Sequence, residues 1–267
     1  MTFRYIRPVI LFVFILLILV SSKSFRETDV AFAVISDTHV GAATSKYVPL
    51  MYLLKREGVR HVLHAGDAIY HPGEIHEWKK FVAGLYPQQV MHLAPGNHDI
   101  RDDASLREYL KVFSSGYSSF SDGDVLFVLL NSEIPGQNGI KGDQFLWLEA
   151  ELKRPFRYKF VFMHRPYYSS TRPDSVLENG NATMLHSLFV NTGVSLVVAG
   201  HYHAYMRSTR DGITYLSMSP GHYRNIFWEF STSGEPGYLV AVRNNRGFLF
   251  TLKDLYGGIM DEFSIVR

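Results

Sequence analysis

Five short motifs rich in aspartate, histidine and asparagine contain the residues of this sequence that are best suited to chemistry. Each motif directly follows an apolar run typical of a buried strand. In chain order they are Asp37-Thr38-His39, Gly66-Asp67, Gly96-Asn97-His98-Asp99, His164-Arg165-Pro166 and Gly200-His201-Tyr202-His203. Because the carboxyl ends of strands in an open α/β sheet meet at one crevice, we expect the five motifs to lie together.

The side chains of these motifs are oxygen and nitrogen donors, and a set without sulfur suits Mn²⁺, Fe, Zn²⁺, Mg²⁺ or Co²⁺. The chain has no cysteine, which excludes Cys-ligated zinc, a thiol nucleophile and a disulfide framework. In Asp37-x-His39 and His201-x-His203, alternate residues of an extended segment project to the same side. Each motif alone is common, but five in this order predict a metal centre.

The order Asp-x-His, Gly-Asp, Gly-Asn-His-Asp, His, Gly-His-x-His resembles that of the calcineurin-like metallophosphoesterases. The motifs cover the chain from Val30 to about His203, and residues Gln144, Trp147, Leu148 and Leu152 resemble a helix that these proteins often carry. The resemblance implies a metallophosphoesterase-type β-sandwich of two mixed sheets flanked by helices, with layers in the order α/β/β/α.

The family's ligand scheme implies two divalent metal ions in each chain, such as Mn, Fe or Zn. It implies that one metal is held by Asp37, His39 and His203. It implies that the second metal is held by Asn97, His164 and His201, and that Asp67 bridges the two. One departure is that Ala68-Ile69-Tyr70-His71 follow the Gly-Asp motif, where many members have an acidic residue or Asn.

By the same resemblance, His98 is a catalytic residue that is not a ligand and faces the leaving-group oxygen or a phosphate oxygen. Asp99 is expected to hydrogen-bond to His98 and fix its orientation. Asn97 and His98, with His222 at the rim, are the predicted substrate-binding residues. The implied reaction is attack on phosphorus by a hydroxide that bridges the metals.

The Asp-Thr-His and Gly-Asn-His-Asp motifs are similar to those of cyclic-nucleotide phosphodiesterase-like members, and this resemblance favours a phosphodiester substrate. A phosphomonoesterase or pyrophosphatase of the same family is the alternative, and a non-catalytic metal-binding scaffold is a further one. Arg101 and Arg165 are the two arginines near the motifs, and arginine is the natural bidentate partner of a phosphate.

The elements that must position these motifs can be read from the periodicity of apolar residues. We predict helices at Ser45–Glu57, Glu74–Leu85, Gln144–Lys153 and Ala182–Phe189. Strands are predicted at Val30–Ser36, Val59–Ala65, Gln89–Ala94, Asp124–Asn131, Lys159–Met163 and Val194–Ala199, and a strand-rich tail at Ile213–Val266. In the second helix, Ile75, Trp78 and Val82 are expected to face inward. The polar stretches Arg101–Asp122 and Tyr167–Asn181 are expected to be loops over the site.

The N-terminus carries an apolar run, Val9–Val20, after Arg4 and Arg7. The run is shorter than the roughly 20 residues of a membrane span, so residues 1–22 are interpreted as a signal-anchor or a cleaved signal peptide. Residues 23–29 form a linker and residues 30–267 the metallophosphoesterase domain. We expect a membrane-anchored protein with its domain outside the cytoplasm, or a secreted or periplasmic one after cleavage.

The charged residues are nearly balanced, with 27 Lys+Arg against 25 Asp+Glu. This balance gives no nucleic-acid-binding signature, which would be a clustered basic face. The expected partners are therefore a phosphate-ester substrate and, through the N-terminal segment, a membrane. Nothing in the sequence specifies an oligomeric state.

Overall fold

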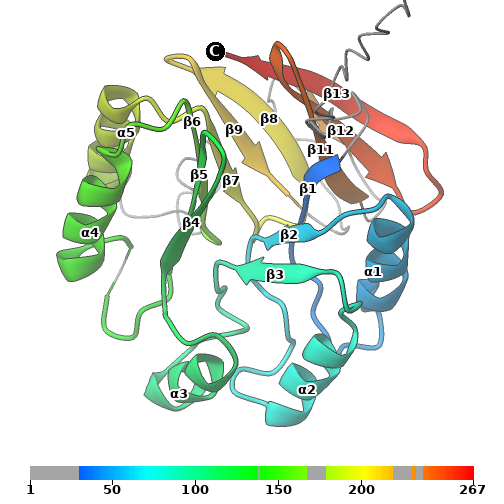
Figure 1. Cartoon of the computed structure of the whole chain (residues 1–267). Coiled ribbons are helices and arrows are strands. Elements are labelled where there is room, and N and C mark those ends of the chain that lie inside the picture. The colour runs from blue at the N-terminus through cyan, green and yellow to red at the C-terminus, as the bar shows by residue number, and fades with distance from the viewer. Residues whose placement is uncertain (1–29, 138, 167–178, 219–229, 233–236) are drawn as a thin grey trace, which may run out of the picture.

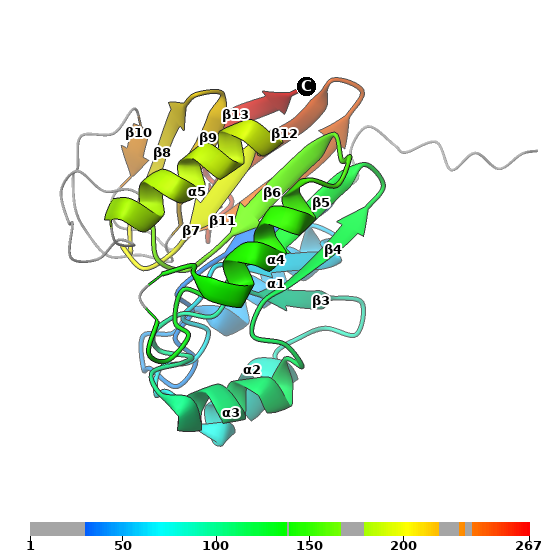
Figure 2. The same ribbon diagram turned by 90° about the vertical axis from the view of Figure 1, so that its left-hand side faces the viewer.

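Two mixed β-sheets pack face to face, with helices on both outer sides, in the computed structural model of the chain (Figures 1 and 2). The structure describes residues 30–137, 139–166, 179–218, 230–232 and 237–267. The predicted N-terminal segment 1–22 and linker 23–29 lie outside the described residues. None of the helices in the described ranges combines the length and the apolarity needed to span a bilayer.

The first sheet has six strands in the order β13-β12-β11-β1-β2-β3. Strands β1, β2 and β3 run parallel, and β11 joins β1 antiparallel. The strands of this sheet are β1 (Val30–Ile35), β2 (His61–His64), β3 (Val90–Leu93), β11 (Gly237–Asn244), β12 (Gly247–Asp254) and β13 (Ile259–Val266).

The second sheet has seven strands in the order β10-β8-β9-β7-β6-β5-β4. Strands β5, β6, β7 and β9 run parallel, and β4 and β8 pair antiparallel at its two sides. Its strands are β4 (Ser118–Asp122), β5 (Val125–Leu129), β6 (Tyr158–Phe162), β7 (Leu196–Ala199), β8 (Tyr205–Arg210), β9 (Ile213–Ser217) and β10 (Phe230–Thr232).

Helices cover the outer face of each sheet and complete the predicted layers (Figure 2). The first sheet is covered by α1 (Tyr47–Arg56), α2 (Ile75–Ala83) and α3 (Asp103–Val112). The second is covered by α4 (Gly142–Leu152) and α5 (Asn179–Thr192). The predicted fold class is confirmed, and so are the predicted strands and helices, with shifts of a few residues at their ends.

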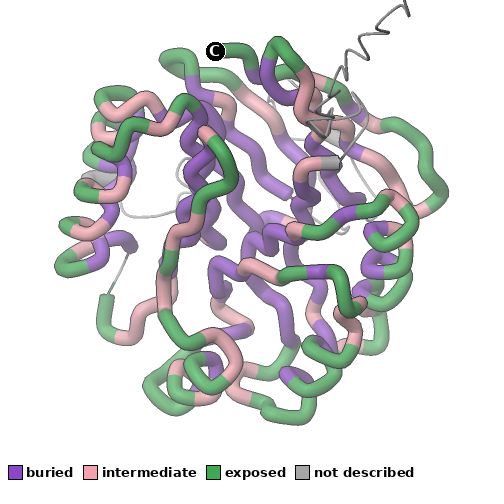
Figure 3. Tube along the Cα trace, in the orientation of Figure 1, coloured by how far each residue is buried: buried purple, intermediate pink, exposed green. Residues whose placement is uncertain are grey.

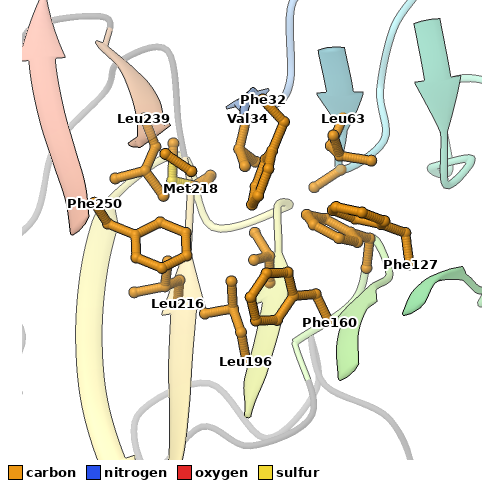
Figure 4. Packing of buried hydrophobic residues seen from close by; sticks show 14 of the residues in the cluster. Phe32, Val34, Leu63, Phe127, Phe160, Leu196, Leu216, Met218, Leu239 and Phe250 are labelled. Atoms are coloured by element: carbon orange, nitrogen blue, oxygen red, sulfur yellow. The ribbon is translucent and has the colours of Figure 1, made fainter. Parts of the chain in front are cut away.

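The core between the sheets is built from large apolar side chains that alternate along each strand. In β1, Phe32 and Val34 face the other sheet, while Ala33 and Ile35 face the helices. Figure 4 shows Phe32 beside Phe127, and the two ring centroids lie 5.1 Å apart. Because both faces of the central strands are covered, their sequences are continuously apolar. The buried strands form the interior of the molecule in Figure 3.

The prediction for the inward face of α2 was partly wrong. Trp78 is fully buried as expected, but Ile75 and Val82 are 41% and 46% exposed. Phe81 and Glu77 are buried instead. Phe81 is the larger apolar side chain, so the helix turns it into the core in preference to Val82.

The expected loop at Arg101–Asp122 was also wrong, because this stretch contains α3 and β4. Asp102 and Ser105 form a capping box at the start of α3, and Tyr109 buries one face of the helix. Strand β4 is polar because it lies at the side of its sheet and pairs only with β5. Of the other predicted loop, residues 167–178 lie outside the described residues, and α5 begins at Asn179.

Candidate metal centre

The loops that follow β1, β2 and β7 turn through left-handed backbone conformations at the predicted ligands. Such positive φ values are uncommon for residues with a Cβ and cost about 1–3 kcal/mol each. The five ligands with positive φ are Asp37 (51°), His39 (44°), Asp67 (57°), His201 (73°) and His203 (53°). Left-handed residues here mark turns that redirect side chains immediately after the strand ends.

Backbone hydrogen bonds between neighbouring loops hold these strained turns in place. The amide of Asp37 donates to the carbonyl of Gly66 over 2.8 Å, and the amide of His39 donates to the carbonyl of Asp67 over 3.0 Å. The amide of His201 donates to the Asp37 carboxylate over 3.1 Å. The loops after β1, β2 and β7 are therefore tied to one another before any ligand binds.

One half of the site gathers Asp37, His39, Asp67 and His203, whose donor atoms all lie within 4.8 Å of one another. His203 Nε2 lies 3.3 Å from Asp37 Oδ1, and His39 Nε2 lies 3.3 Å from Asp67 Oδ2. The carboxylates are buried, while the two histidines are partly exposed. This half contains all the residues predicted for the first metal.

The other half is centred on His164, which is fully buried. Its Nε2 lies 3.2 Å from Asn97 Oδ1, 3.2 Å from His201 Nδ1 and 3.4 Å from Asp67 Oδ2. Asp67 Oδ2 thus lies beside a histidine of each half. The structure brings all seven predicted ligands together and places Asp67 between the two groups.

Hydrogen bonding around His164 shows that a cation fits this site. His164 Nδ1 lies 2.9 Å from the carbonyl of Ala65, which can only accept, so Nδ1 carries the hydrogen of a neutral ring. The bare Nε2 then faces the oxygens of Asn97 and Asp67, which are also acceptors. A cation among these lone pairs would offset their mutual repulsion, and nitrogen and oxygen donors suit a divalent transition metal.

The electrostatics of the metal-free site agree with this requirement. Burial opposes a charged His164 ring, but the Asp67 and Asp37 carboxylates raise its pKa to about 10. Burial likewise opposes ionisation of Asp67, yet His164 and His39 hold its pKa well below the usual range. A proton on His164 therefore stands in for metal charge, and metal binding would release it.

His98 lies at the edge of the ligand cluster. Its amide donates to Asp67 Oδ1 over 2.8 Å, and its Nδ1 donates to the carbonyl of Tyr70 over 2.6 Å. The ring stacks on Tyr70 and lies 4.8 Å from the His39 ring, between centroids. Since Nδ1 is fixed by a carbonyl, Nε2 is the nitrogen left for a substrate.

The predicted hydrogen bond between Asp99 and His98 was wrong. Asp99 is fully buried, and its carboxylate accepts the amides of Ala68, Ile69 and Gly96 over 2.8–3.1 Å. Burial and the Asp67 charge raise the pKa of Asp99 to about 7. Asp99 joins the loops after β2 and β3, while the His98 ring is held by the Tyr70 carbonyl, so among the described residues no hydrogen bond links Asp99 to the His98 ring.

Glu77 is a residue of the site that the sequence analysis missed. Its buried carboxylate accepts the amides of Tyr70 and His71 over 3.0 and 2.8 Å, and lies 2.7 Å from His71 Nδ1. It therefore fixes the turn whose carbonyl holds His98. The only sequence signal was an acidic residue in the first turn of a helix, which normally serves the helix dipole. Gly41 makes room for this carboxylate, because a Cβ there would lie 2.1 Å from Glu77 Oε1.

Of the other histidines, His61 and His92 contact each other over 3.1 Å, and both rings stack on Phe120 of β4. His64 is buried and lies 2.9 Å from the Thr38 hydroxyl. His222, predicted at the rim, lies outside the described residues.

Comparison with known proteins agrees with this geometry. The calcineurin-like phosphoesterase family model matches residues 30–205. The human serine/threonine-protein phosphatase CPPED1 is 32% identical over 127 residues, which are 42% of this chain and 40% of that protein. The chain spans less than half the length of the curated relatives that it matches.

Two solved structures share the fold. A purple acid phosphatase, PPD1, from yellow lupin seeds superposes with a TM-score of 0.71 at 17% identity, over 88% of this chain and 53% of that one. GAP50, described as the anchor in the inner membrane complex of Plasmodium, superposes with a TM-score of 0.68 at 14% identity, over 88% of each chain. At these identities the likeness concerns the fold alone.

Proposed function

The chain belongs to the calcineurin-like phosphoesterase family, and from this premise we propose that it hydrolyses phosphate esters with two divalent metal ions. The observation that carries the proposal is the position of Asp67 Oδ2, 3.3 Å from His39 Nε2 and 3.4 Å from His164 Nε2. Asp67 Oδ2 thus lies beside one histidine from each half of the site, which is the arrangement that a ligand bridging two metals requires.

When bound, a metal pair would supply an activated water as nucleophile and would neutralise charge on the phosphoryl group. The protein's part is to hold the pair and to manage a proton. His98 Nδ1 is committed to the Tyr70 carbonyl, so Nε2 is the atom that can carry a proton to the leaving oxygen. Such general-acid catalysis contributes typically about 10²–10⁴-fold in rate.

For the substrate, the sequence favoured a phosphodiester, and that preference stays a prediction. The sequence relative CPPED1 supports a phosphomonoester instead, because it is named a serine/threonine-protein phosphatase. Metal identity is part of the proposal as well, with Mn²⁺, Fe and Zn²⁺ all compatible with the nitrogen and oxygen donors.

The test uses the purified chain loaded with Mn²⁺ and an aryl phosphomonoester beside the matching aryl phosphodiester, with Asn97→Ala as control. We expect turnover that chelator abolishes and that the control variant lacks. Two bound metals without turnover of either ester would contradict the proposal and favour a binding scaffold.

We also propose that residues 1–22 direct the protein to a membrane and place residues 30–267 outside the cytoplasm. The apolar run Val9–Val20 after Arg4 and Arg7 supports this location. Protease added to intact cells should degrade the domain if the segment acts as an anchor. A protected, full-length chain would contradict this location.

A further inference from the structure

Arg165 directly follows the ligand His164, and its guanidinium is fixed by an ion pair with Glu133. Arg165 Nε donates to Glu133 Oε1 over 2.9 Å, and Nη2 donates to Oε2 over 3.0 Å. The Glu133 side chain is only 7% exposed, and the Ser132 hydroxyl also donates to it, over 2.8 Å. A guanidinium held through two of its nitrogens has a fixed plane, so the direction of Nη1 is fixed too.

The remaining nitrogen, Arg165 Nη1, faces the metal centre. It lies 3.4 Å from His201 Nε2. The other nitrogen of that ring, His201 Nδ1, lies 3.2 Å from His164 Nε2 and so points into the ligand cluster. His201 therefore has one nitrogen toward the metals and the other toward Arg165.

As the structure stands, Arg165 Nη1 can donate to a bare His201 Nε2. Ligation of a metal through His201 Nδ1 would change this and would leave two hydrogen-bond donors facing each other. A neutral imidazole that ligates a metal through Nδ1 carries its hydrogen on Nε2. A ligating histidine normally donates that hydrogen to an acceptor, but a guanidinium has no acceptor atom. Within the part of the chain that the structure describes, His201 Nε2 has no other partner. The N–H groups of His201 and Arg165 thus both need an acceptor when the metals are bound.

We propose that a terminal phosphoryl oxygen of the substrate occupies this position and that it makes the site selective for phosphomonoesters. The inference rests on the proposed function. A phosphomonoester has three terminal oxygens and a phosphodiester has two. If each of two bound metals took one phosphoryl oxygen, a monoester would retain an anionic oxygen for Arg165 and His201, whereas a diester would have none to offer.

Arg101 provides a matched comparison, since it is the other arginine near the motifs. Its side chain is 70% exposed, and its nearest carboxylate is that of Asp102, at 4.0 Å. An exposed pair of this kind contributes little. Among the described residues, no pair of hydrogen bonds fixes the plane of this guanidinium, so the structure assigns phosphate recognition to Arg165.

The experiment compares Arg165→Met with Arg101→Met in the full-length, Mn²⁺-loaded protein. A hydrogen bond between charged groups is worth about 10- to 100-fold in affinity. We expect kcat/KM for an aryl phosphomonoester to fall by roughly that factor in Arg165→Met, and kcat/KM for the aryl phosphodiester to change by less than about threefold. Binding of inorganic phosphate, measured by calorimetry, should weaken by the same factor, while metal content and the Arg101→Met protein remain unchanged.

Equal losses on both esters with unchanged phosphate affinity would overturn the inference. If Arg165→Met loses its metals, Arg165→Lys is the second test. A single ammonium paired with Glu133 cannot also reach the position beside His201, so phosphate affinity should again fall, and unchanged affinity would count against the proposal. A wild-type protein that binds metals and phosphate but cleaves neither ester would refute the proposed function, while the phosphate titration would still test Arg165.

Discussion

Gly200 stands where the loop after β7 meets the loop after β1, and replacing it with alanine should weaken metal binding. A Cβ at this position would lie 2.1 Å from Ser36 Oγ, 2.6 Å from the Ala65 carbonyl oxygen and 2.7 Å from Asp37 Oδ2. The serine hydroxyl can rotate away, but the carbonyl belongs to the backbone. Asp37 can move only by giving up its place beside His203.

The size of the effect follows from these contacts. Overpacking a buried position costs typically about 1–3 kcal/mol, and a clash with backbone places Gly200→Ala in the upper half of that range. If the cost falls on the position of Asp37, the metal dissociation constant should rise by roughly 30- to 150-fold.

Calorimetric titration of metal-free protein with Mn²⁺ measures this change. Gly116→Ala is the control, because its Cβ would make only an ordinary contact with Asn131 Nδ2, at 3.5 Å. Mn²⁺ affinity of Gly200→Ala within about threefold of the wild type would refute the reasoning that this close approach positions Asp37.

Three further predictions concern His98, Glu77 and His92. His98→Ala should keep both metals but lose about 10²–10⁴-fold in kcat on an alkyl phosphate. The loss in kcat should be smaller on a nitrophenyl phosphate. Equal losses on the two substrates would contradict proton donation by His98 to the leaving oxygen. Glu77→Gln weakens the turn at Tyr70 and should lower kcat about tenfold. Metal analysis beside the same assay should show unchanged metal content. A kcat equal to that of the wild type would contradict the role of Glu77. Burial and the His61 charge lower the pKa of His92 to about 4, so below about pH 6.5 the unfolded chain binds more protons than the folded one. The free energy of unfolding should therefore fall as the pH is lowered from about 6.5 to 4. Urea unfolding of metal-free protein should show a smaller fall in His92→Phe, and an identical fall would contradict this.

The fold and the ligands could be predicted because each rests on a local pattern. Apolar runs that are buried on both faces, such as that of β1, identify central strands. Five polar motifs at strand ends then identify one edge of the sheets. Parallel strands bring their carboxyl ends together, which predicts that the motifs meet. The assignment of the seven ligands came from the resemblance of these motifs, in their order, to the calcineurin-like metallophosphoesterases.

The errors arose where a side chain's partner is distant in sequence or belongs to the backbone. Asp99 was expected to serve the adjacent His98, yet it accepts backbone amides of Ala68 and Ile69 from another loop. Glu77 looked like an ordinary residue in the first turn of a helix. Arg101 and Arg165 were equal candidates until the structure showed that only Arg165 is fixed, through Glu133. Such pairings depend on tertiary packing, which periodicity does not encode.

The central claim is that two metals, joined by Asp67, act together on a phosphate ester. The most direct test titrates metal-free protein with Mn²⁺ while bound metal and phosphomonoester turnover are followed in the same samples. We predict that turnover rises chiefly with the second bound equivalent and is absent in Asp67→Ala. Full turnover with one metal per chain, or two bound metals without turnover, would contradict the account.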